Sequence, residues 1–121
     1  MPRPVLDESH IHPAIRDRIS AHQQAILKEV SAAVAANAVV VVGMGMNPFP
    51  KKACKLLDVA GVAYKYLEYG NYFSTWRARN ALKMWTGWPT LPMVFVKGML
   101  VGGFSDLEKL SASGGLKKML A

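Results

Sequence analysis

The stretch that decides the fold is VVVVGMGMNPFPKK, residues 39–52. Four consecutive valines are typical of a strand that is buried on both faces, as strands of parallel sheets are. The residues that follow, up to Met46, carry no regular apolar pattern and predict a loop. Asn47 and Pro48 then predict the start of a helix, because asparagine is a favoured N-cap and proline is tolerated in the first turn. The stretch therefore reads as strand, loop and helix.

Downstream, apolar runs alternate with glycine and proline breaks. The helix that begins at Pro48 is predicted to end near Gly61, a typical C-cap residue. A stiff link, Trp88 to Pro92, precedes two short strands joined across Lys97-Gly98, which is a hairpin signal. After the helix that begins at Pro48, the predicted elements are a strand, a helix, two hairpin strands and a last helix, at residues 62–69, 72–85, 93–96, 99–101, and from Ser105 or Asp106 onward.

Upstream, residues 1–12 predict a flexible lead and residues 13–36 a helix. Pro13 suits a first helical turn, and apolar residues recur after it near helical spacing. The chain thus reads α, β, α, β, α, β, β, α. A β-α-β unit followed by a hairpin predicts a mixed sheet with helices on both faces.

Four short motifs follow one another along these elements: Asn47-Pro48-Phe49-Pro50-Lys51-Lys52 after the valine strand, Arg79 eleven residues before Thr90, Trp88-Pro89-Thr90-Leu91-Pro92, and Gly102-Gly103-Phe104-Ser105-Asp106. In this order and spacing they resemble the glutaredoxin family, over roughly residues 13–121. The Trp-Pro-Thr-x-Pro motif and the long first helix are similar to its monothiol branch. Each motif alone is common, and the order of all four carries the resemblance.

The resemblance implies the thioredoxin fold: an α/β three-layer sandwich with a four-stranded mixed sheet and helices on both faces. It implies a single domain over residues 1–121. Residues 13–36 would then be an extra N-terminal helix, and residues 37–121 the thioredoxin-fold core.

The family binds glutathione, a tripeptide with two carboxylates and one ammonium group, and the resemblance assigns residues to each part. A cis Pro92 would expose the backbone of Leu91 beside Thr90, so that the cysteinyl residue of glutathione pairs with it like an added strand. Backbone N–H groups at a helix start would hold the γ-glutamyl carboxylate, and Asp106 the ammonium group. The expected glutathione-binding residues are Lys51, Arg79, Thr90, Leu91, Pro92, Gly103, Phe104, Ser105 and Asp106, with Arg79 and Lys51 on the glycyl carboxylate.

The sequence also departs from the family. Asn47 stands where the resemblance places the catalytic cysteine, Pro50 where dithiol members have a second one, and Met44 where the family has a loop lysine. Asn47 has no nucleophile, so the usual exchange cannot run through it. Cys54 is the sole thiol and hence the one candidate for a relocated catalytic residue. It lies about 10 Å along the helix from Asn47 at 1.5 Å per residue, where a small half-buried helix residue is the simpler interpretation.

The leading functional hypothesis is therefore a protein of glutathione-linked thiol-disulfide chemistry that keeps its groove and has weak or no classical activity. A non-catalytic module that binds glutathione, a peptide or a protein partner on the same scaffold is the alternative. A protein thiol or disulfide would be a further partner. Thiol-independent glutathione transfer ranks lower, because the helical second domain usual in transferases is missing. Glutathione is the expected ligand and no iron-sulfur cluster is expected, since Asn47 supplies no thiolate.

Composition and charge narrow the range of expected ligands and cellular locations. The net charge is +7, and residues 37–121 carry all of it, with eleven Lys and Arg against four Asp and Glu. This charge favours anionic ligands, but no long basic run or aromatic-basic motif indicates nucleic acid. No apolar run reaches the roughly 18 residues of a membrane span, and His10 and His12 do not make a metal site. A single cysteine and no secretory signal favour the cytoplasm.

Overall fold

The computed structural model of the chain describes residues 3–21, 24–45, 47–70 and 76–121. Its helices are the 3-10 helix η1 and six α-helices, and its strands are β1 to β4. In chain order these are η1 (Glu8–His10), α1 (Pro13–Ala21), α2 (Gln24–Ala36), β1 (Val39–Gly43), α3 (Pro48–Val59), β2 (Lys65–Glu68), α4 (Trp76–Thr86), β3 (Met93–Val96), β4 (Met99–Gly102), α5 (Phe104–Ala112) and α6 (Gly115–Leu120).

The four strands form one mixed sheet in the order β2-β1-β3-β4. β1 pairs in parallel with β2 and antiparallel with β3, and β3 pairs antiparallel with β4. The parallel pair is joined through α3, because parallel strands need a crossover, and the antiparallel β3 and β4 need only a tight turn. The predicted four-stranded mixed sheet is confirmed.

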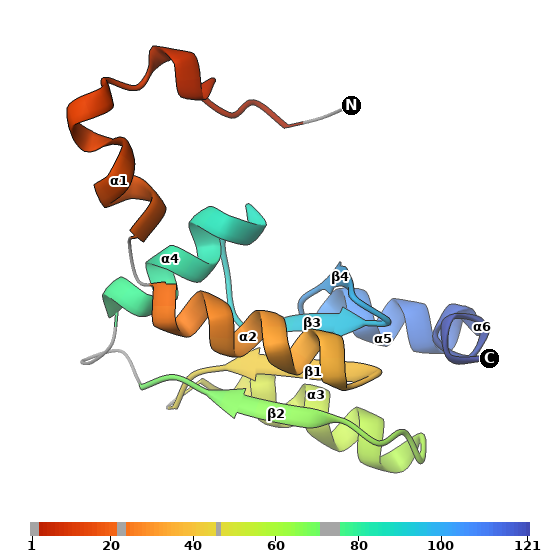
Figure 1. The fold of residues 1–121 in the computed structure, drawn as a ribbon. Coiled ribbons are helices and arrows are strands. Elements are labelled where there is room, and N and C mark those ends of the chain that lie inside the picture. The colour runs from red at the N-terminus through yellow and green to blue at the C-terminus, as the bar shows by residue number, and fades with distance from the viewer. Residues whose placement is uncertain (1–2, 22–23, 46, 71–75) are drawn as a thin grey trace.

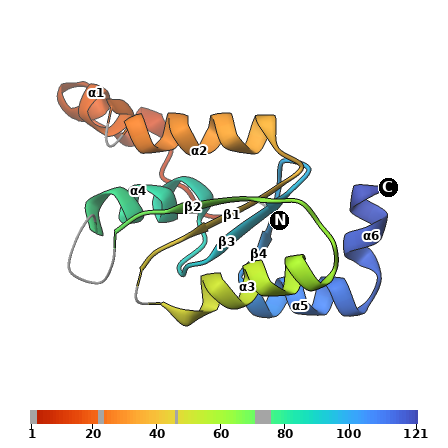
Figure 2. The same cartoon turned by 90° about the horizontal axis from the view of Figure 1, so that it is seen from below.

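Helices cover both faces of this sheet, in three layers (Figures 1 and 2). α2 and α4 lie on one face, and α3 and α5 on the other. The valines of β1 divide between the two cores because successive strand side chains point to opposite faces: Val40 and Val42 pack under α2, and Val39 and Val41 pack against α3. All four are buried, as expected from their continuous β-branched run.

The helix predicted over residues 13–36 is two helices, α1 and α2, on either side of residues 22–23, which lie outside the described residues. The apolar spacing is helical in both, but the two helices differ in how much apolar surface they bury. α2 buries Ile26 and Val30 on the sheet, whereas Ile15 and Ile19 of α1 stay 38% and 48% exposed. Periodicity alone did not separate a helix that packs on the sheet from one that extends away from it (Figure 1).

The last predicted helix is also two helices, α5 and α6. Gly114 separates them with a φ of +80°, a left-handed conformation that glycine adopts without strain. The cap predicted at Ser105 or Asp106 is instead Gly103, and Asp106 is the third helical residue. Leucines of this last segment therefore reach the core from two helices, since Leu107 of α5 and Leu116 of α6 are both buried.

Gly43 ends β1 where α3 crosses closest. A Cβ at this position would lie 2.6 Å from Cβ of Pro50, so only glycine lets the first turn of α3 approach the strand. This close approach brings the start of α3 beside the link before β3 and the start of α5.

Candidate functional site

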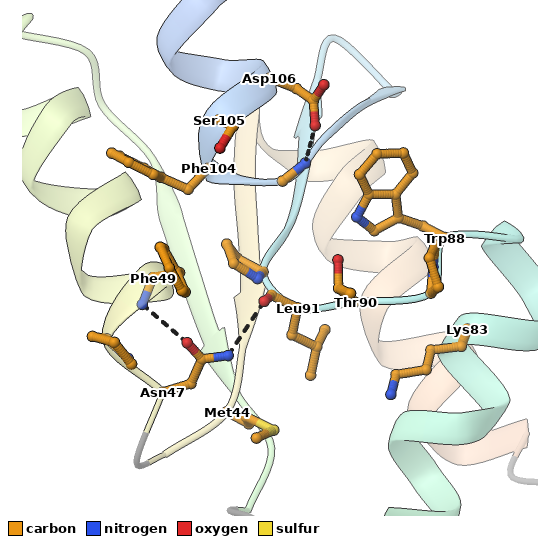
Figure 3. Close-up of a pocket in the computed structure, with 14 residues that line it drawn as sticks. Met44, Asn47, Phe49, Lys83, Trp88, Thr90, Leu91, Phe104, Ser105 and Asp106 are labelled. Carbon is orange, nitrogen blue, oxygen red and sulfur yellow. Dashed lines mark hydrogen bonds between the residues drawn. The ribbon is translucent and has the colours of Figure 1, made fainter.

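A groove of about 500 Å³ opens where these three segments meet (Figure 3). This volume is in the range of small-molecule sites, roughly 300–1,000 Å³. Its walls come from the loop and first turn of α3, the end of α4, the link before β3, and the first turn of α5. The lining residues are Met44, Asn47, Pro48, Phe49, Lys83, Trp88, Pro89, Thr90, Leu91, Pro92, Gly103, Phe104, Ser105 and Asp106.

The middle of the groove is the link from Trp88 to Pro92. The Leu91–Pro92 peptide bond is cis. Leu91 lines the groove, although the residue as a whole is only 8% exposed. Its carbonyl oxygen accepts a hydrogen bond from Asn47 Nδ2 at 3.3 Å. A carbonyl oxygen has a second lone pair, so this contact leaves capacity for a ligand.

Asn47 ties the start of α3 to this link. It is the helix N-cap, with φ −106° and ψ 122°, and its Oδ1 accepts a hydrogen bond from the Phe49 N–H at 3.0 Å. The same amide donates to Leu91 with its Nδ2, so both ends of the side chain are engaged (Figure 3). An amide donates and accepts hydrogen bonds but does not attack a disulfide, and therefore the groove has no nucleophile at this point.

The first turn of α5 supplies the polar end of the groove. Asp106 Oδ2 accepts a hydrogen bond from the Gly103 N–H at 3.1 Å, so this N–H, expected to be free for a ligand, is already satisfied. The N–H groups of Phe104 and Ser105 follow it and have no preceding helical turn to accept them. Helix starts of this kind favour an anion, through these N–H groups and the helix dipole.

Gly102 shapes the same turn. Its φ of +115° is one that L side chains rarely adopt, and a Cβ there would meet Asp106 Oδ2 at 2.5 Å. The carboxylate therefore occupies the space that a side chain at this position would need. Behind the turn, the buried Trp88 Nε1 has no hydrogen-bond partner among the described residues.

Not every predicted residue reaches the groove. Thr90, Leu91, Pro92, Gly103, Phe104, Ser105 and Asp106 line it together. Arg79 does not: it is 6% exposed, and its guanidinium donates to the Tyr69 carbonyl at 3.2 Å. Lys51 is exposed on α3 outside the lining. The basic residue among those that line the groove is Lys83 of α4.

Lys83 was not among the residues predicted from the sequence, because the family resemblance pointed to Arg79 as the basic residue of this helix. The two residues are one helical turn apart on α4, so they share a face. That i, i+4 spacing was the available signal. Trp88, Met44 and Phe49 also line the groove, and Met46 lies outside the described residues.

Cys54 is not brought to the groove. It is half-buried on α3 and packs at the margin of the core formed with Leu57 and Val41. Burial raises the pKa of the Cys54 thiol and Asp58 raises it further, against a hydrogen bond with Tyr64 that lowers it. Redox-active cysteines have the opposite character, an exposed thiolate of low pKa.

The described residues contain no group of three or more His, Cys, Asp or Glu side chains able to hold a metal ion. Nor does any helix among them have the length and apolarity to cross a bilayer.

Comparison with known proteins identifies the family. The glutaredoxin family profile matches residues 39–101. A glutaredoxin-like protein of Dictyostelium discoideum is 47% identical over 95 residues, which cover 78% of this chain and 77% of that protein. The chain belongs to the glutaredoxin family. Family membership implies glutathione-linked thiol redox chemistry as the background of this fold.

One further relative and one solved structure are similar to this chain. The mitochondrial monothiol glutaredoxin-5 of Schizosaccharomyces pombe is 35% identical over 75 residues, 62% of this chain and 51% of that protein. The crystal structure of a buckwheat glutaredoxin-glutathione complex superposes with a TM-score of 0.70 at 25% identity, covering 82% of this glutaredoxin-family chain and 90% of that one. The thioredoxin fold expected from the sequence is confirmed.

Proposed function

We propose that this chain is a glutathione-binding glutaredoxin-family protein that works without the family's catalytic thiol, with Asn47 in the thiol's place. Classical thiol-disulfide activity is then weak or absent. The observation that carries the proposal is the groove itself. It combines the peptide backbone of Leu91, a helix start at α5 and a cation at Lys83 around a side chain that has no nucleophile.

The parts of the groove match the parts of glutathione. The Leu91 backbone pairs with the cysteinyl residue as a short added strand. The Phe104 and Ser105 N–H groups take the γ-glutamyl carboxylate. The free oxygen of the Asp106 carboxylate takes the γ-glutamyl ammonium, because its other oxygen holds the Gly103 N–H. Lys83 takes the glycyl carboxylate in place of the expected Arg79 and Lys51.

The chemistry follows from what is absent at Asn47. In thiol-disulfide exchange a thiolate attacks one sulfur of a disulfide, a new S–S bond forms, and the other sulfur leaves as a thiolate. An amide cannot make the first bond, so no mixed disulfide forms at residue 47. The same lack of a thiolate makes this groove a poor fit for the two-iron cluster expected of monothiol members. We therefore propose glutathione as the ligand and no cluster.

Binding is tested by calorimetric titration of reduced glutathione into the wild-type protein. We expect a dissociation constant at or below the low millimolar range. Asp106→Asn removes the charge but keeps an acceptor for the Gly103 N–H, and should weaken binding about tenfold, the value of a charge-assisted bond. Lys83→Ala should weaken it about fivefold, as loss of a partly exposed ion pair does.

The matched control is Lys117→Ala, which removes the same charge from an exposed site on α6. It should bind like the wild type, apart from a small general effect that vanishes at moderate salt. Absence of heat for the wild type, or an equal loss in Lys117→Ala, would refute the proposed site.

The missing thiol is tested by restoring it. Asn47→Cys puts a thiol at a helix N-terminus, where the helix dipole lowers its pKa. This variant should acquire glutathione-dependent disulfide reduction, whereas the wild type and Cys54→Ser should be equally inactive. If the wild type reduces disulfides at the rate of Asn47→Cys, and Cys54→Ser abolishes that rate, catalysis has moved to Cys54 and the proposal fails.

The alternative is a non-catalytic module that binds a peptide or a protein partner. It is favoured by one feature, the backbone of Leu91, which can pair with any extended chain as well as with a tripeptide. Binding of extended peptides without competition from glutathione would favour this alternative. The single thiol, which needs no disulfide partner, also suits a reducing compartment such as the cytoplasm.

A further inference from the structure

Two phenyl rings stand at the groove beside Asn47. Phe49 and Phe104 have ring centroids 6.2 Å apart at an interplanar angle of 36°, and they come from different helices, α3 and α5 (Figure 3). Phe49 is 46% exposed. The Lys52 ammonium lies 4.9 Å from the centroid of the Phe49 ring. A phenyl this exposed at the side of a ligand groove is apolar surface available for contact.

The apolar surface continues beyond the pair. Phe104 also lines a second depression of about 510 Å³ between α3 and α5, whose other lining residues are Lys52, Lys55, Leu56, Val59, Ala60, Glu108 and Ser111. Val59 there is 82% exposed. The two phenyl rings therefore form a ridge at the groove, and Phe104 also borders the second, partly apolar depression.

The ridge lies where the sulfur of a bound glutathione would emerge. Asn47 Nδ2 is 3.3 Å from the Leu91 carbonyl oxygen, so whatever residue pairs with Leu91 lies next to Asn47. Phe49 is two residues further along the same helix turn. A substituent carried on that sulfur meets no thiol at residue 47, and the two phenyl rings are partly exposed apolar surface in the same groove.

We propose that the groove takes glutathione thioethers, with the apolar S-substituent lying across Phe49 and Phe104. This inference rests on the proposed glutathione site and names its ligand class. The carbon-sulfur bond of a thioether does not undergo thiol-disulfide exchange, so the protein holds such a conjugate without changing it. A groove without a nucleophile suits a ligand whose sulfur is already blocked.

The expected gain in affinity follows from the area that the ridge offers. Full burial of one methylene is worth about 0.8 kcal/mol, roughly a fourfold change in affinity. The ridge is open to solvent on its outer side, so a hexyl chain is covered only in part. We expect S-hexylglutathione to bind about tenfold tighter than S-methylglutathione.

The test is calorimetric titration of the wild-type protein with glutathione, S-methylglutathione and S-hexylglutathione. Phe49→Ser and Phe104→Ser should each reduce the ratio of S-methyl to S-hexyl dissociation constants toward one, whatever they do to overall affinity. Met99→Ser is the control. It removes a side chain that is 63% exposed on the hairpin and lines neither depression, and should keep the tenfold ratio.

The outcomes separate this inference from the proposed function. Binding of glutathione with a ratio near one in the wild type would overturn the thioether inference and leave the glutathione site standing. Binding of none of the three ligands would overturn both. A tenfold ratio that persists in both phenylalanine variants would also overturn the inference, because the alkyl chain would then lie elsewhere. The ligand series needs only the wild-type protein, so a ratio near one overturns the inference even where a variant fails to fold.

Discussion

Replacing Asn47 by alanine should destabilise the protein measurably, because this side chain holds two segments 44 residues apart in sequence. The variant loses the N-cap hydrogen bond to the Phe49 N–H, worth about 1 kcal/mol. It also loses the bond to the Leu91 carbonyl, which is long at 3.3 Å and only partly buried, worth about 0.5–1 kcal/mol. The free energy of unfolding should therefore fall by about 1.5–2 kcal/mol.

This loss converts to a melting temperature through the unfolding entropy. At roughly 2.1 cal/mol/K per residue, a chain of 121 residues has an unfolding entropy of about 0.25 kcal/mol/K. Each kcal/mol then lowers Tm by about 4 °C, and Asn47→Ala should lower it by about 6–8 °C. Differential scanning calorimetry measures both quantities directly.

Asn47→Ser divides the effect between the two bonds. Serine caps a helix about as well as asparagine, but its hydroxyl is too short to reach Leu91 as well. Its Tm should fall by only about 2–4 °C. Hydrogen exchange gives a second readout, since the Phe49 amide should stay protected in Asn47→Ser and exchange faster in Asn47→Ala. An Asn47→Ser variant as stable as the wild type, or falls below about 2 °C for both variants, would show that Asn47 does not tie α3 to the link.

Three further outcomes are expected. Gly102→Ala should lower Tm by about 8 °C or more, because it adds a clash with the Asp106 carboxylate to the cost of a positive φ. Gly61 also has a positive φ, +72°, but lies in open space, so Gly61→Ala should lower Tm by about half as much. Equal falls in Tm would contradict the clash. Cys54 should react with iodoacetamide more slowly in the folded than in the denatured protein at pH 8, because burial raises the pKa of its thiol. A faster reaction in the folded protein would make Cys54 a candidate redox residue again. Burial and the hydrogen bond to Glu29 raise the pKa of the Tyr69 hydroxyl, so the stability that this hydroxyl contributes is complete below the ordinary tyrosine pKa near 10 and is lost as pH rises above that value. Tyr69→Phe should therefore flatten the fall in Tm above about pH 10. An unchanged dependence of Tm on alkaline pH would argue against a link between Tyr69 ionisation and stability.

Much of the fold was predictable from local patterns. The valine run of β1 indicated a strand buried on both faces, and Asn47-Pro48 indicated the start of α3 by residue type alone. The Lys97-Gly98 turn between β3 and β4 was equally plain. These features depend on a few neighbouring residues, so tertiary context had little to change. The same local order carried the resemblance that the family comparison confirmed.

The errors came from elements whose limits depend on what they pack against. A periodic pattern over residues 13–36 predicted one helix, but only α2 rests on the sheet. One helix was predicted for the last segment as well, and Gly114, with its left-handed backbone, divides it into α5 and α6. Periodicity reports which side chains share a face, and it does not report how long that face stays in contact.

The sequence by itself determined that this chain is a glutaredoxin-type α/β domain whose expected nucleophile position holds an amide. Only the tertiary structure decided that Lys83 rather than Arg79 lines the groove, that Asn47 binds Leu91, and that Phe49 and Phe104 meet. Residue identity limits what chemistry is available, since an amide cannot become a thiolate. Contacts between segments far apart in the chain depend on the packing of whole helices on the sheet, which no short motif contains.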